Sequence, residues 1–93
     1  MSYTVKFSKK AEKSIRKAPK QVQQKMALWK VIVESKGLLA ARVIKGFHDK
    51  PLHGHRSSER SIRLNLQWRA IYKTSSEGKV MLIEVIEVTP HKY

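Results

Sequence analysis

The chain has 93 residues, no cysteine, and 20 Lys and Arg against 7 Asp and Glu, which gives a formal net charge of +13. The length predicts one domain over residues 1–93, and an apolar fraction of 41% is typical of a folded domain. The absence of cysteine excludes disulfides, thiolate metal sites and a cysteine nucleophile. Because no segment is long and apolar enough for a membrane span or a signal peptide, we expect a cytoplasmic protein.

The positive charge indicates a polyanionic partner, because a chain this basic repels itself. Residues 1–59 hold 14 of the Lys and Arg residues and only four acidic ones. Nucleic acid is the first candidate partner. The alternatives are a solvated lysine surface and an anionic membrane. The membrane is less favoured because the basic segments also contain core-type apolar residues.

The N-terminal half predicts a strand followed by two helices. Apolar and polar residues alternate over residues 1–7, which indicates a strand. Ser8 stands at the N-cap position of a helix that begins at Lys9. Pro19 ends this helix and opens a second one, which Gly37 stops. We expect the two helices to form an antiparallel hairpin joined by a tight turn.

Each predicted helix has an apolar face and a basic face. The apolar stripe of the second helix contains Trp29, for which core packing is favoured over stacking on a nucleic-acid base. The basic face is a candidate RNA contact, with a merely solvated face as the alternative. Its members are Lys9, Lys10, Lys13, Arg16, Lys17, Lys20 and Lys25.

The C-terminal half predicts a short helical turn over residues 38–44, a loop over 47–59 and then three strands. In the first strand, which begins at Arg60, period two places Ile62, Leu64 and Leu66 on the core face. The second strand is expected over 68–73, before a turn at 75–78. The third, over 80–88, is nearly all apolar and is therefore expected to be central. Thr89 and Pro90 are expected to end it.

This order of elements predicts an α+β domain. It comprises an N-terminal strand, a two-helix hairpin and a C-terminal antiparallel three-stranded unit. We expect one small sheet with helices packed on one face. The other face is then open to solvent or to a ligand, and Ser61, Arg63 and Asn65 point toward it.

The C-terminal half also resembles a known family. The segments that carry the resemblance are Leu52–Gly54, Ser61–Leu64, Trp68–Tyr72, Val85–Val88 and the terminal His91 and Tyr93. In order and spacing they resemble the RelE/ParE toxin superfamily, and within it the RelE and HigB branches. The resemblance implies the RelE-like fold. It also implies a ribosome-dependent endoribonuclease that cuts messenger RNA in the ribosomal A site and is silenced by an antitoxin encoded beside it.

The implied chemistry uses no metal and no cofactor. The ribose 2′-hydroxyl attacks the adjacent phosphate and the 5′-oxygen leaves. This needs a base, an acid and cations that stabilise the charge on the phosphate. Arg63 matches a basic strand position of the family, and the alternative is a solvated or salt-bridged arginine. Arg69 matches the family's arginine that stabilises the transition state, and the alternative is a structural ion pair with Glu84 or Glu87.

Histidine and tyrosine provide the candidate acid and base. His91 and Tyr93 resemble residues at the end of the HigB-like branch, although a frayed terminus is the alternative. His53 is the candidate partner in the loop before the strands, and His55 lies two residues on. The roles of acid and base stay unassigned among these four. Two histidines without further ligands are poor evidence for a metal site, so no metal is predicted.

Further basic residues are candidate RNA contacts, namely Lys50, Arg56 and Arg60. The RelE branch often has two alternating basic residues on the strand that holds Arg63, whereas this chain has Ser61 at the earlier position. Arg60 would have to shift its register to compensate, which favours the histidine-assisted mechanism of the HigB branch. Trp68 is open between core packing and base stacking.

Two other functions compete with the ribonuclease. The ParE branch of the same superfamily inhibits DNA gyrase without cutting RNA. A non-enzymatic nucleic-acid-binding module would use the charge alone. The expected partners are the 70S ribosome with its messenger RNA and a cognate antitoxin that offers an acidic, amphipathic segment, with no membrane and no small-molecule ligand. Such a segment would relieve the self-repulsion and cover the helices or an open sheet edge.

Overall fold

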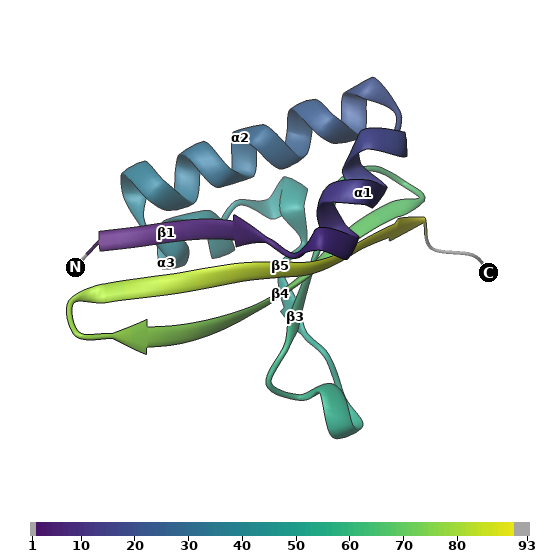
Figure 1. Cartoon of the computed structure of the whole chain (residues 1–93). Coiled ribbons are helices and arrows are strands. Elements are labelled where there is room, and N and C mark those ends of the chain that lie inside the picture. The colour runs from purple at the N-terminus through teal and green to yellow at the C-terminus, as the bar shows by residue number, and fades with distance from the viewer. Residues whose placement is uncertain (1, 91–93) are drawn as a thin grey trace.

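The computed structural model of the chain describes residues 2–90. Its strands form one five-stranded sheet, and the helices lie on one side of it (Figure 1). This confirms the predicted α+β architecture. The elements in chain order are β1 (Ser2–Phe7), α1 (Lys9–Lys17), α2 (Lys20–Lys36), α3 (Leu38–Arg42), the 3₁₀ turn η1 (Lys45–Phe47), β2 (Lys50–Pro51), the 3₁₀ turn η2 (Gly54–Arg56), β3 (Arg60–Arg63), β4 (Trp68–Glu77) and β5 (Val80–Pro90).

The sheet has the strand order β1-β5-β4-β3-β2. β1 pairs with β5 in parallel, while β3, β4 and β5 form the predicted antiparallel unit. The apolar strand β5 is interior, as expected. It does not end before Thr89, because Thr89 still pairs with Arg69 and Pro90 pairs with Trp68. A proline is tolerated at such a strand end, where its missing N–H breaks no ladder.

Two boundaries differ from the sequence prediction. The predicted loop over residues 47–59 contains a fifth strand, β2, in which Lys50 pairs with Ser61 and Pro51 with Arg60. A two-residue strand that includes proline is too short to show a period of two. The predicted turn at residues 75–78 is tighter than expected, because β4 continues to Glu77 and the chain reverses at Gly78, whose φ is 57°.

The helix α1 begins at the predicted cap. The hydroxyl of Ser8 accepts a hydrogen bond from the Ala11 amide and donates one to the Ile86 carbonyl, both at 3.1 Å. This ties the start of α1 to β5. The predicted antiparallel hairpin is wrong, because α1 stands at a steep angle to α2 (Figure 1). Ala18 and Pro19 are extended between the helices and turn the chain.

The core lies between the helices and the sheet and is centred on Trp29 and Tyr72, both fully buried. Their ring centroids lie 5.1 Å apart, so the prediction of a core role for Trp29 is confirmed. Leu66 does not join the core and is 85% exposed. The Asn65 carboxamide oxygen accepts the amide hydrogens of Gln67 and Trp68 at 2.8 and 2.7 Å, and this turn carries Leu66 outward. Within residues 2–90, no helix has the length and apolar character that a membrane span requires.

Candidate functional site

Arg63 and Arg69 stand directly opposite each other on β3 and β4. Their neighbours Ile62 and Ala70 are also paired and are fully buried in the core. Because side chains alternate along a strand, the two arginines point away from the helices, toward the other face of the sheet. Like charges in directly opposite positions destabilise a sheet. This pair therefore costs stability unless an anion lies between the two side chains.

Neither arginine forms an ion pair with a carboxylate of the described residues 2–90. The glutamates that were alternatives for Arg69 are engaged elsewhere: Glu84 pairs with Lys73, and Glu87 pairs with both Lys10 and Arg56. Two adjacent guanidinium groups without such a partner can bind one phosphate with several charge-assisted hydrogen bonds.

A third cation joins these arginines from β2. Lys50, His48, Arg63 and Arg69 line a small cavity of about 70 Å³, together with Ser61 and Ile62. We call this site the cationic pocket. Lys50 pairs with Ser61, so it brings a positive charge to the strand position where Ser61 itself provides none. From the sequence, Lys50 was predicted only as an RNA contact, and His48 was not among the predicted site residues.

Arg60 does not shift its register to compensate for Ser61, and it is not part of the cationic pocket. It lies on the opposite side of β3, where its Nε is 2.6 Å from Oδ1 of Asp49. Burial lowers the pKa of the Arg60 guanidinium, but the hydrogen bond and charge of Asp49 outweigh burial, so the pKa is raised overall. The Asp49 side chain is 0% exposed, so Arg60 serves to neutralise a buried carboxylate.

Tyr72 completes this buried cluster. Its hydroxyl donates to Oδ2 of Asp49 at 2.6 Å, and Arg42 Nε donates to the same hydroxyl at 3.4 Å. Burial and the hydrogen bond to Asp49 raise the pKa of Tyr72 to about 12. The Asp49 carboxylate is thus held on both of its oxygens. It fixes the backbone between η1 and β2, the segment that carries His48 and Lys50 into the cationic pocket.

Other predicted residues lie elsewhere. His53 is exposed and precedes η2, and it does not line the cationic pocket. Arg56 Nε lies 2.6 Å from Glu59 Oε1, so the charge of this predicted RNA contact is already paired. The candidates His91 and Tyr93 lie outside the described residues. Within residues 2–90, no group of three His, Asp or Glu side chains is arranged to hold a metal ion.

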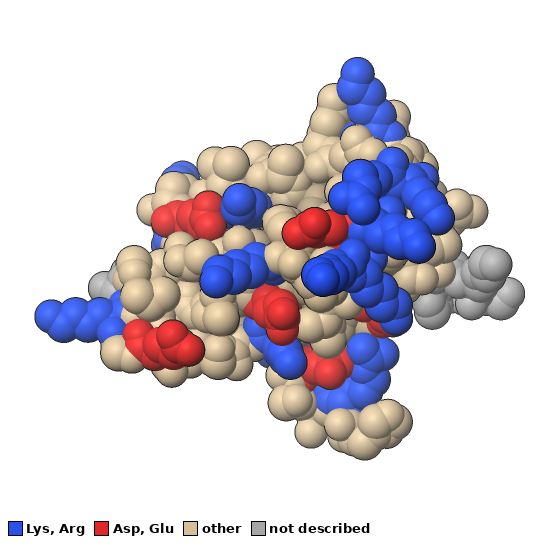
Figure 2. Space-filling model, in the orientation of Figure 1, with Lys and Arg blue, Asp and Glu red and all other residues tan. Residues whose placement is uncertain are grey.

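The basic residues of α1 form a second positive surface. Figure 2 shows Lys and Arg side chains gathered over this helix. All of its basic residues are exposed, and we call them the α1 basic surface: Lys9, Lys10, Lys13, Arg16 and Lys17. The sequence predicted this clustering because helical spacing places these residues around one short helix.

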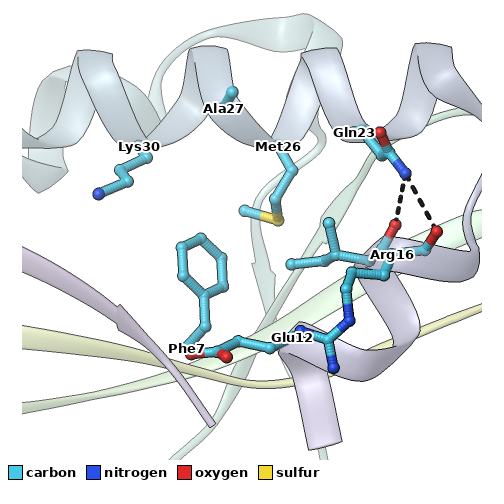
Figure 3. Close-up of a pocket in the computed structure, with 8 residues that line it drawn as sticks. Phe7, Glu12, Arg16, Gln23, Met26, Ala27 and Lys30 are labelled. Atoms are coloured by element: carbon cyan, nitrogen blue, oxygen red, sulfur yellow. Dashed lines mark hydrogen bonds between the residues drawn. The ribbon is translucent and has the colours of Figure 1, made fainter. Parts of the chain in front are cut away.

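An apolar groove lies in the corner between α1, α2 and the end of β1 (Figure 3). Its volume is about 380 Å³, and its apolar walls are Phe7, Ile15, Met26 and Ala27, with Glu12, Arg16, Gln23 and Lys30 as the polar lining. The Gln23 amide donates to the Ile15 and Ala18 carbonyls at 2.8 and 3.2 Å. These hydrogen bonds join α2 to the end of α1 and fix the corner between the two helices. This groove was not predicted from the sequence, because the expected antiparallel helices would have packed against each other at this place.

No protein-family model matches the chain, and no curated protein matches its sequence. Solved structures do match its fold. A YoeB/ParE toxin from Agrobacterium tumefaciens has a TM-score of 0.69 at 17% identity, over 96% of this chain and 99% of that chain. A chain of the E. coli DinJ-YafQ toxin-antitoxin complex has a TM-score of 0.74 at 18% identity, over 98% and 94%. A chain of the archaeal RelE-RelB complex from Pyrococcus horikoshii has a TM-score of 0.70 at 24% identity, over 97% and 96%.

These likenesses extend over nearly the whole of each chain, while the sequence identities stay below 25%. They agree with the element order from which the sequence resemblance was drawn. The chain therefore has the fold of the RelE/ParE toxins.

Proposed function

We propose that this protein is the toxin of a type II toxin-antitoxin system and a metal-independent endoribonuclease that cuts messenger RNA in the ribosomal A site. The observation that carries the proposal is the opposition of Arg63 and Arg69, which no carboxylate of residues 2–90 neutralises. Lys50 adds a third charge beside them. The toxin fold of the solved neighbours adds support.

The cationic pocket suits phosphodiester cleavage by the ribose 2′-hydroxyl. As the 2′-oxygen bonds to phosphorus and the bond to the 5′-oxygen breaks, negative charge builds on the phosphate oxygens. Arg63 and Arg69 would bind those oxygens, and fixed donors of this kind are typically worth about 100- to 1000-fold in rate. Lys50 would hold a neighbouring phosphate. Proton transfer needs further groups, for which His91, Tyr93 and His53 remain the candidates from the sequence.

The α1 basic surface would bind ribosomal RNA. Its five Lys and Arg residues lie on one exposed helix, and phosphate contacts of this kind give affinity without sequence specificity. Ribosome binding through α1 and cleavage in the cationic pocket would then use separate surfaces. A protein that acts on translating ribosomes would work in the cytoplasm.

Primer extension on messenger RNA bound to translating ribosomes tests the proposal. We expect new cuts at A-site codons with the wild-type protein and a loss of at least about 100-fold with Arg69→Ala. Lys36→Ala, which removes one positive charge from the exposed end of α2, is the matched control and should cut like wild type. Cuts that persist in Arg69→Ala would show that the pocket is not the active site.

The gyrase-inhibiting branch of the superfamily is the alternative. A supercoiling assay on the same preparation separates the two functions, because gyrase inhibition without RNA cuts would assign the chain to the ParE-like activity. Salt-sensitive RNA binding with neither activity would indicate a binding module.

We propose further that a cognate antitoxin places an acidic, amphipathic helix in the groove between α1 and α2. The walls of the groove are apolar, and Arg16 and Lys30 lie beside them. The walls can therefore pack against the apolar face of such a helix, and the two basic side chains can pair with its acidic residues. Complexes named toxin-antitoxin among the solved neighbours are consistent with such a partner. Binding there would also offset part of the +13 net charge.

A further inference from the structure

His48 lies in the cationic pocket with Lys50, Arg63 and Arg69. All three histidines within residues 2–90 are exposed, and of these His53 and His55 do not line this cavity. The structure therefore brings one imidazole to the paired arginines, and it is not one that the sequence pattern indicated.

The backbone of His48 is in an unusual conformation. Its φ of 45° and ψ of 47° are left-handed, and among the described residues it is the one non-glycine residue with a positive φ. The left-handed region is unfavourable for an L-residue with a Cβ, and glycine or asparagine normally occupies it. A histidine at such a position, beside a cluster of cations, is a feature that often marks a functional residue.

Both neighbours of His48 are anchored, so its position is not that of a free loop. Phe47 is 2% exposed and packs in the core, and the His48 amide donates to the Lys45 carbonyl at 3.1 Å. Asp49 is fixed by Arg60 and Tyr72 through contacts of 2.6 Å each. With one neighbour in the core and the other in the buried polar cluster, the intervening residue is held at the pocket.

We propose that His48 is the proton-accepting residue of the cationic pocket, an inference that rests on the proposed ribonuclease function. The unprotonated ring nitrogen of a neutral imidazole can accept a proton from a hydroxyl group. His48 takes the proton of the 2′-hydroxyl while the 2′-oxygen bonds to phosphorus. The bond from phosphorus to the 5′-oxygen breaks, and the leaving 5′-oxygen takes a proton from a separate general acid. Arg63 and Arg69 bind the phosphate oxygens throughout.

The test is the rate of cutting on ribosome-bound messenger RNA as a function of pH, with the wild type, His48→Gln and the control Lys36→Ala, which changes an exposed residue of α2 outside the cationic pocket. We expect His48→Gln to lose at least about 100-fold in rate, as general-base removal typically does. The rise of the wild-type rate with pH should disappear in His48→Gln, a change that a purely structural role would not produce. Lys36→Ala should retain both the rate and the pH profile.

A second variant separates catalysis from folding. His48→Gly relieves the left-handed backbone, so its melting temperature should equal or exceed that of wild type, while its cutting rate falls like that of His48→Gln. If the wild type cuts and His48→Gln cuts with the same rate and pH profile, this inference is overturned and the proposed function stands. If the wild type makes no cuts under any condition, both are overturned.

Discussion

The buried hydroxyl of Tyr72 offers a quantitative test of how the pocket segment is held. Tyr72→Phe keeps the ring that packs against Trp29 and removes only the O–H that donates to Asp49 at 2.6 Å. A hydrogen bond to a charged group contributes about 1.5–3 kcal/mol. Asp49 retains Arg60, so we expect the variant to be less stable than wild type by about 2 kcal/mol at pH 7. For a domain of this size, that loss corresponds to a fall in melting temperature of roughly 10 °C.

The difference should shrink at alkaline pH. The pKa of Tyr72 is raised from 10.0 to about 12 in the folded protein, so between these values the folded state keeps a proton that the unfolded state has lost. The stability that this group contributes is therefore fully present below pH 10 and is lost as the pH rises through 12. The loss for wild type amounts to about 2 kcal/mol by pH 12, while Tyr72→Phe has no such titration.

Urea unfolding of both proteins between pH 7 and 12 measures this effect. Titration of the many lysines is common to the two proteins and cancels in the difference of their free energies of unfolding. We expect a difference of about 2 kcal/mol at pH 7 that closes toward zero near pH 12. A difference that stays constant over this range, or one that is absent at pH 7, would refute the assigned contact between Tyr72 and Asp49.

Two further predictions concern the end of α2 and the apolar groove. Gly37→Ala should destabilise the protein by at least about 1–2 kcal/mol, because Gly37 has a φ of 94° and a Cβ would lie 3.2 Å from the Tyr3 ring. Gly46→Ala, where a Cβ meets nothing within 4 Å, should leave the melting temperature unchanged or slightly raised, and equal losses in the two variants would contradict this account. Ala27→Glu, which places an acid in the groove wall, should weaken binding of the acidic protein encoded beside this chain's gene by at least about tenfold in calorimetry. Gln24→Glu adds the same charge at an exposed position of α2 outside the groove, and equal effects of the two variants would remove the groove from the interface.

The elements with long periodic patterns could be predicted from the sequence. β5 reads as an interior strand because its apolar run needs cover on both sides, and Ser8 and Gly37 mark the ends of the helical region through their own side-chain and backbone chemistry. The angle between α1 and α2 could not be predicted in this way. It depends on extended backbone at Ala18 and Pro19 and on the Gln23 amide that bonds to the last carbonyls of α1. Neither leaves a periodic signal.

The arginines of the pocket could be found because alternation along one strand already separates Arg63 from the core face. Their partners could not, because Lys50 enters the site through β2, a strand of two residues with no visible period, and His48 lies in the short connection before that strand. The placement of this strand depends on Asp49. In the sequence, Asp49 is one acidic residue in a basic loop, and its natural interpretation is an exposed side chain.

Arg60 shows how the same ambiguity can mislead. Arg60 stands next to Ser61, where the family pattern has a cation, but it could take that role only by a shift of register. Strand alternation already places Arg60 on the core side, where a free guanidinium would be costly to bury. A buried arginine on that side therefore requires a carboxylate partner, and Asp49, which precedes the paired strand β2, provides it, while Glu59 pairs with Arg56. The desolvation cost of Arg60 therefore predicts a carboxylate partner such as Asp49. The place of Arg60 in the family pattern does not predict one. The pairing of Lys50 with Ser61 is consistent with that contact.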